Sequence, residues 1–316
     1  MQSRWLAVEK GGTLLGRGCR NQGGVMSNDV TEGRAVATWL MVVRHPLTRL
    51  IVLGGALFSM MAISGGYMEQ FKGDTFRLIA IVTGMVAAAL AVYVGYARLI
   101  EGRSADDLAL TGAAREWGAG LLCGAGLYTA AVLILMTLGI YRIEGFNPWT
   151  FLIPAIALAL HSGFFEELVF RGVLFRSVED MFGSWISLVV SSAVFGLMHL
   201  INPTATLMGA IFISIEAGLL LAAAYMLTRR LWLSIGFHMA WNYTQSAVFS
   251  GIVSGGVADP GLIRPIIRGP DLLTGGNFGL ESSVIAFALC TATGITLLVM
   301  AVRRGRIVPP PWARDG

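Results

Sequence analysis

Long stretches without a charged residue constrain this chain more than any other feature. Residues 78–97 (LIAIVTGMVAAALAVYVGYA) and 282–302 contain no Asp, Glu, Lys or Arg. Each stretch can cross a bilayer as a helix, because a transmembrane helix needs about 20 mostly apolar residues. The sequence therefore predicts an all-α fold, a polytopic integral membrane helical bundle of about eight spans. These are expected near residues 50–66, 78–97, 117–140, 148–170, 184–201, 205–228, 231–250 and 282–302.

The composition supports a lipid bilayer as the surroundings of this chain. Its residues are 55% apolar and 13% charged, whereas about 25% of a soluble domain is charged. This excludes a soluble globular enzyme and a disordered protein, and no nucleic-acid partner is expected. The 40 glycines suit close helix packing, and Gly120-x-x-x-Gly124 can serve it within one chain or between chains.

The distribution of Lys and Arg predicts the orientation, because cytoplasmic loops carry an excess of both. If the N-terminus is cytoplasmic, the only Lys or Arg residues on the outer side are Lys72, Arg77, Arg142, Arg264 and Arg268. Both termini are therefore expected in the cytoplasm. The predicted domains are a mobile N-terminal segment (1–46), one transmembrane domain (47–303) and a cytoplasmic tail (304–316). A Gly- and Pro-rich connection, 251–280, is expected to be an irregular outer loop.

Ionisable residues inside the predicted spans are candidates for function, because a charge in the hydrocarbon is costly. Three motifs and one isolated acid contain them. The motifs are FFEELVFR at 164–171, FGLMH at 195–199 and HMAWN at 238–242, and the isolated acid is Glu216. The motifs lie on three different predicted spans, whereas Glu216 has no assigned role.

Helical spacing separates the roles of the two neighbouring glutamates. Glu167 and Arg171 are four residues apart, which places a Glu and a cation on one helix face in the favourable order. Arg171 is therefore expected to neutralise and orient Glu167. Glu166, about 100° around an α-helix from Glu167, is left free to face a cavity.

The remaining motif residues complete a hydrolytic site. Phe195 is expected to form a wall beside His199, and His238 and Asn242 share one helix face. Glu166 can act as the general base on a water and later as the acid toward the leaving amine. The imidazoles can hold that water directly, or through a metal such as zinc bound by His199 and His238 with Glu166. Asn242 is a neutral donor suited to the oxyanion of a tetrahedral intermediate.

The three motifs resemble those of one membrane family. EELVFR, FGLMH and HMAWN are similar, in order and in spacing, to its Glu-Glu-x-x-x-Arg, Phe-x-x-x-His and His-x-x-x-Asn motifs. This family is the CPBP intramembrane metalloproteases (ABI family), which comprises type II CAAX prenyl proteases and bacteriocin-processing enzymes. The resemblance covers about residues 115–250, the expected catalytic core. It implies a membrane endopeptidase with Glu166 as the water activator and Glu167 and Arg171 as its support.

The resemblance also implies partners, while several alternatives stay open. The substrate would be a peptide or protein that is prenylated or carries a leader. The membrane would be the plasma (inner) membrane of a bacterium or the endoplasmic reticulum of a eukaryote. A zinc-dependent and a metal-free, glutamate-driven mechanism both fit these residues. The alternative functions are a non-catalytic protein of the same fold in bacteriocin self-immunity and a secondary transporter that relays protons.

Overall fold

The computed structural model describes residues 39–314, so most of the expected segment 1–46 lies outside the described residues. Within this part, seven helices are long and apolar enough to cross a membrane. The fold class, a polytopic helical membrane bundle, is confirmed. The helices are α2 (Pro46–Gln70), α3 (Thr75–Gly95, continued to Ile100), α4 (Ala113–Thr137), a helix from Trp149 to Phe182 that includes α5 (Ala155–Leu160) and α6 (Arg176–Phe182), α7 (Ser184–Met198, continued to Ile201), α8 (Leu207–Ile213) continued into α9 (Leu220–Thr228), and α12 (Val284–Arg303).

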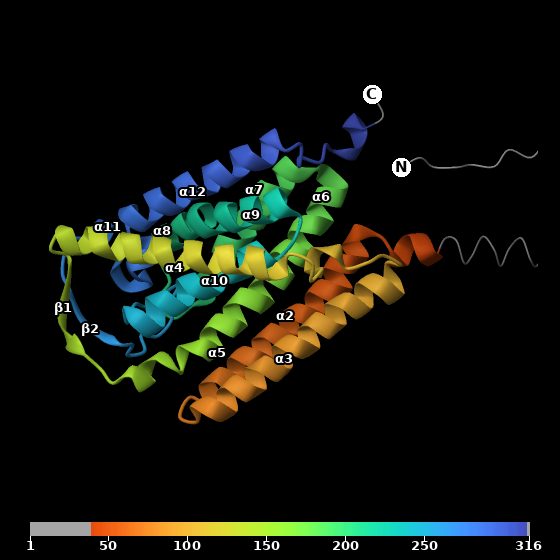
Figure 1. Cartoon of the computed structure of the whole chain (residues 1–316). Coiled ribbons are helices and arrows are strands. Elements are labelled where there is room, and N and C mark those ends of the chain that lie inside the picture. Colours follow the sequence, from red (N-terminus) through yellow and green to blue (C-terminus); the bar gives the residue numbers. More distant parts are fainter. Residues whose placement is uncertain (1–38, 315–316) are drawn as a thin grey trace, which may run out of the picture. The chain divides into compact units, whose positions relative to one another are not determined.

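The span expected at 231–250 is shorter than the other seven. It consists of the 12-residue helix α10 (Trp232–Tyr243), continued by five π-helical residues, Thr244–Val248. Most of α10 is buried, and it lies between α4 and α5 (Figure 1). A helix enclosed by its neighbours need not match the thickness of the hydrocarbon, because other helices rather than lipid surround it.

Glycines bring the backbones of α4 and α10 together. A Cβ atom on Gly124 would overlap the backbone of Phe237, and one on Gly236 would overlap the carbonyl oxygen of Trp117. Gly120 faces the α10 backbone in the same way. Small residues on facing helices allow such a close approach. The small-residue pair of α4 therefore packs within the chain, against the helix that carries His238 and Asn242.

Replacing Gly124 with Ala should lower the melting temperature of the protein in detergent micelles. The added methyl group meets backbone atoms that cannot rotate away, and overpacking of this kind costs about 1–3 kcal/mol. Gly126→Ala, on the same helix, is the matched control, since no described atom lies within 4 Å of its added Cβ. The control should be neutral or slightly stabilising. Equal destabilisation by both substitutions would contradict this packing.

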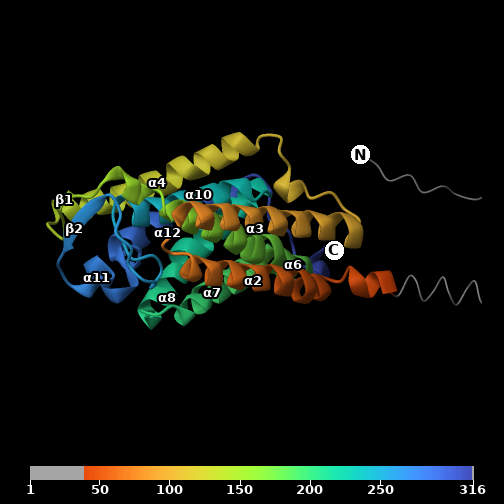
Figure 2. The same ribbon diagram turned by 90° about the horizontal axis from the view of Figure 1, so that it is seen from below.

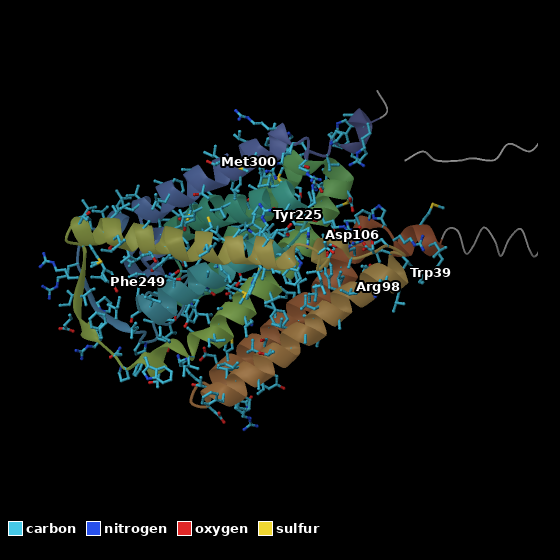
Figure 3. All side chains as sticks on the ribbon, viewed as in Figure 1. Trp39, Arg98, Asp106, Tyr225, Phe249 and Met300 are labelled. Atoms are coloured by element: carbon cyan, nitrogen blue, oxygen red, sulfur yellow. The ribbon has the colours of Figure 1, made fainter. Side chains whose placement is uncertain are left out.

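Arginines join the helices at one end of the bundle. Arg49 of α2 is buried and bonds Glu101, after α3, at 2.9 Å and Asp180 of α6 at 2.5 Å. Arg98 and Asp106 lie at the same end (Figure 3). Figure 2 shows α2 and α3 side by side across one face of the bundle. The side of the membrane that this end faces stays a prediction.

The opposite end contains a short two-stranded sheet that the sequence analysis did not predict. Strand β1 (Tyr141–Phe146) pairs antiparallel with β2 (Ile263–Ile267), with Tyr141 opposite Ile267. The expected irregular loop at 251–280 thus contains a strand, followed by the short helix α11 (Asp271–Thr274). These two segments pair their backbone groups with each other. Such pairing between distant segments leaves no periodic signal in either one.

Candidate active site

Two π-helical stretches carry the glutamates of the first motif. They are His161–Glu166 and Leu168–Phe175, joined by Glu167. The sequence analysis assumed α-helical geometry here, and this local expectation was wrong. A π-helix pairs residues five apart and is frequent at functional sites. The wider turn still places Glu167 and Arg171 within reach of each other.

Glu167 is at the centre of a buried polar cluster. The ion pair expected from its spacing is present, since Arg171 Nη1 lies 2.8 Å from Glu167 Oε1. The same oxygen accepts a 2.9 Å hydrogen bond from His238 Nδ1. The side chains of Glu167 and Arg171 are only 0% and 1% exposed, so Glu167 Oε1 binds both partners in the interior of the protein. It fixes the ring of His238, as an acid behind a functional histidine does.

Arg171 links this cluster to two further helices. Its Nη2 donates to the backbone oxygens of Ala217 and Gly218, at 3.2 and 3.3 Å, between α8 and α9. Its guanidinium carbon also lies 4.6 Å from the centre of the Phe195 ring on α7. The arginine is therefore an internal cross-link.

Glu166 is in a different environment from its neighbour. Its side chain is 18% exposed, and its Oε2 lies 3.8 Å from His238 Nε2, too far for a hydrogen bond. No Lys or Arg of the described chain pairs with Glu166, and its Oε2 has no hydrogen-bond partner there. The Glu166 carboxylate and His238 Nε2 therefore face the same region without a hydrogen bond between them.

His199 lies at the C-terminal end of α7. Its Nδ1 is 2.7 Å from the carbonyl oxygen of Phe195, so Nδ1 carries the proton and Nε2 remains an acceptor. Its ring centre is 4.7 Å from that of Phe195, which stands as the expected wall. His199 is close enough to Glu166 and His238 to interact with both electrostatically. The structure thus brings together all three motifs.

Asn242 lies one helical turn beyond His238 and is held in place by a serine. Its Nδ2 donates to Ser162 Oγ at 2.9 Å, and that hydroxyl donates to the carbonyl oxygen of Leu158 at the same distance. Only one of the two amide hydrogens is used in this contact. The second remains available to an acceptor. Ser162 was not selected from the sequence, because an isolated serine in an apolar span gives no signal.

A small cavity of about 20 Å³, room for about one water, adjoins this cluster. Phe195, His238 and Asn242 form part of its lining. Glu216, unassigned in the sequence analysis, lies in the same lining with Glu281, which the sequence analysis missed. Glu281 lies in the 3₁₀ turn Leu280–Ser282, just before Ser283, the N-cap of α12, and an acid near a helix N-terminus is usual. That ordinary position concealed its location in the cavity.

The donor groups do not fit a metal centre in this arrangement. Across residues 39–314, no group of three or more His, Cys, Asp or Glu side chains is placed to hold a metal ion. His199 and His238 were the expected ligands, with Glu166. Since the fit fails, no step of the mechanism is derived through a metal.

The comparisons with known proteins agree with the motifs. Residues 148–244 match the family model described as type II CAAX prenyl endopeptidase Rce1-like. No curated protein and no solved structure matches the chain significantly. The matched range contains Glu166, His199, His238 and Asn242, whereas Glu281 lies beyond it. The chain is therefore a polytopic membrane protein whose residues 148–244 are similar to the type II CAAX prenyl endopeptidase Rce1-like family.

Proposed function

We propose that this chain is an intramembrane endopeptidase that cleaves membrane-associated or lipidated substrates with a water activated by Glu166. The contrast between the two glutamates carries this proposal. Glu167 is buried and ion-paired, whereas Glu166 is partly exposed and has no Arg or Lys partner in the described chain. A general base must be free to take up a proton, and only Glu166 of this pair is.

The proposed reaction proceeds in two steps. Glu166 removes a proton from water as the water oxygen bonds to the peptide carbonyl carbon, which converts the carbonyl oxygen to an oxyanion. Glu166 then gives the proton to the leaving nitrogen as the carbon–nitrogen bond breaks.

Several other residues support these steps. His199 Nε2 accepts a hydrogen bond from the attacking water, since Nδ1 is occupied by Phe195. Asn242 donates its free amide hydrogen to the oxyanion, with the amide fixed by Ser162. Glu167 holds the ring of His238 so that its Nε2 is directed toward Glu166. His238, Glu167 and Arg171 therefore act as positioning residues.

The family match supports a CAAX-type reaction, and the substrate class within it belongs to the proposal. A prenylated C-terminal tail and a leader-bearing peptide both present an extended segment at the membrane surface. The test therefore should not assume either one. Membranes from cells that carry the parent protein or Glu166→Gln, at matched abundance, should be compared for newly formed peptide termini.

Termini that disappear in the Glu166→Gln membranes would identify the substrates and support proteolysis. The exposed Glu144→Gln variant is the control and should leave these termini in place. Identical termini in all three samples, with every protein folded and its substrates present, would refute proteolysis. That outcome would favour the non-catalytic role in bacteriocin self-immunity.

Removal of metal ions should leave the activity within about twofold of its initial value. We propose a metal-independent reaction, because the described residues offer no group of three metal-binding side chains, and catalytic zinc sites use three protein ligands. Purified protein treated with 1,10-phenanthroline and then dialysed should cleave an identified substrate peptide at the untreated rate. Loss of activity that zinc restores would show that the proposal is wrong.

A further inference from the structure

The sheet formed by β1 and β2 has one buried face and one exposed face. Residues two apart in a strand lie on the same face of a sheet, and so do residues directly opposite each other. Tyr141 lies opposite Ile267, and Ile263 is four residues from Ile267 along β2, so all three belong to one face. Tyr141 and Ile263 are only 1% and 7% exposed. That face therefore points into the protein, and Arg264 and Ile266 of β2 lie on the opposite face.

Three arginines share this opposite face, and all of them are exposed. Arg142 of β1 lies directly opposite Ile266, and Arg264 is two residues from Ile266 along β2. Arg268 directly follows β2, and its backbone N–H continues the pairing by donating to the carbonyl oxygen of Ile140 at 3.0 Å. Arg264 and Arg268 are therefore the two diagonal neighbours of Arg142, at a spacing of about 7–8 Å. One anion can contact Arg142 together with either of them.

Most of the guanidinium nitrogens on this face are free to bind an anion. Arg142 uses only its Nε, which donates to the carbonyl oxygen of Gly139 at 3.2 Å. The guanidinium of Arg264 lies across Gly145, since a Cβ atom on that glycine would overlap it. Among residues 39–314, the side chains of Arg264 and Arg268 have no hydrogen-bond or ion-pair partner. The three side chains are thus held near one another without being neutralised.

The neighbouring acids do not pair with these arginines. Glu144 of β1 and Asp271 of α11 are exposed, and neither forms an ion pair within the described part of the chain. Asp259, in the loop before β2, is paired with Lys72 at 2.9 Å. The arginine face is therefore open to an anion from outside the chain.

The place of the sheet in the fold identifies that anion. Strand β1 joins α4 to the helix that begins at Trp149, and both helices are long and apolar enough to cross a membrane. The sheet lies beyond one end of α4 (Figure 1), where the spans leave the hydrocarbon. Phe146 and Trp149 are 64% and 68% exposed there, and aromatic residues are enriched at the level of the lipid headgroups. The phosphates of lipids are the anions that surround a sheet at this level.

A cavity beside the arginine face has room for a headgroup. It has a volume of about 510 Å³, and Arg268, Ser250 and Thr274 belong to its lining. Ligand pockets commonly have volumes of this order, and the planar guanidinium group matches the geometry of a phosphate. We propose that Arg142, Arg264 and Arg268 bind the phosphate groups of anionic membrane lipids, with a headgroup in this cavity. The proposal does not depend on proteolysis.

The test measures which lipids the full chain retains in detergent micelles. Equal amounts of phosphatidylglycerol and phosphatidylcholine with the same acyl chains are added, and native mass spectrometry counts the bound molecules of each. Both lipids have a phosphate, but only phosphatidylcholine has a cationic group, which the arginines repel. Phosphatidylglycerol should be preferred by at least about fivefold, the usual contribution of one basic residue near an anionic surface. Equal retention of the two lipids would overturn the proposal.

Two triple variants with the same change in charge separate a site from the net charge. Arg142→Gln, Arg264→Gln and Arg268→Gln together should abolish the preference. Because these side chains are exposed, the melting temperature in lipid-free micelles should stay near that of the parent. The control triple variant changes three exposed arginines on separate elements and should keep the preference; its substitutions are Arg98→Gln, Arg115→Gln and Arg314→Gln. An equal loss in both triple variants would overturn the proposal.

A soluble phosphate ester distinguishes a lipid site from a site for a metabolite. Glycerol phosphate has the same phosphate group but no acyl chains, and it should leave the bound phosphatidylglycerol in place. Displacement of the lipid by glycerol phosphate at the same concentration would show that the site recognises a soluble phosphate ester. That result would overturn the assignment to a lipid, whatever the outcome of the cleavage experiments.

Discussion

Glu166→Gln is expected to lower kcat for cleavage of an identified substrate peptide by about 10²–10⁴-fold, the usual contribution of general acid–base catalysis. The amide has nearly the same shape as the carboxyl group but cannot accept the proton from water. Because Glu166 has no arginine or lysine partner in the described chain, its neutralisation leaves no buried cation unpaired. The melting temperature and KM should therefore change little. The measurement is steady-state kinetics with purified protein in micelles.

Replacing Glu166 with the shorter acid Asp tests whether the carboxylate at this position acts as a base or only supports the structure. Glu166→Asp keeps the carboxylate but withdraws it by one methylene, so it should retain more activity than Glu166→Gln. Glu144→Gln, at an exposed glutamate on β1, should leave kcat unchanged. A Glu166→Gln protein that turns over at the parent rate would remove Glu166 from the role of base.

The sequence predicted the features that depend on local spacing. The positions of the spans follow from runs of apolar residues, and the Glu167–Arg171 pair follows from residues four apart on a helix. The different environments of Glu166 and Glu167 also follow, since an ion pair on one face leaves the adjacent residue facing elsewhere. The π-helical geometry at this point was not predictable, because no residue type marks a π-helix.

Contacts between distant segments explain most of what the sequence analysis missed. Glu281 lies 40 residues from Trp241, to which it is hydrogen-bonded, and no periodicity connects them. Likewise, no periodicity in the sequence connects β1 with β2, although the two strands pair with each other. On sequence alone, Gly120 and Gly124 fit packing within one chain or between chains, whereas in the structure the backbone of α10 lies against both of them. The partner of a small residue cannot be identified from one helix alone.

Arg171→Met is expected to destabilise the protein by about 3–5 kcal/mol, the usual cost of breaking a buried ion pair by removing one partner. Glu167 would be left charged at 0% exposure, and the carbonyl oxygens of Ala217 and Gly218 would lose a donor. Thermal unfolding in micelles measures the effect. Arg268→Met, at an exposed arginine on the loop after β2, is the control and should unfold near the parent temperature.

A double variant separates the contribution of this pair to stability from its contribution to catalysis. Glu167→Leu combined with Arg171→Met replaces both charges by apolar groups, and such replacements of buried pairs are often neutral or stabilising. Stability should therefore recover, while activity stays low, because His238 Nδ1 loses the acceptor that orients its ring. Recovery of both stability and activity would mean that the Glu167–Arg171 pair only stabilises the fold. Recovery of stability alone is the expected result, since the same oxygen of Glu167 binds the arginine and the histidine.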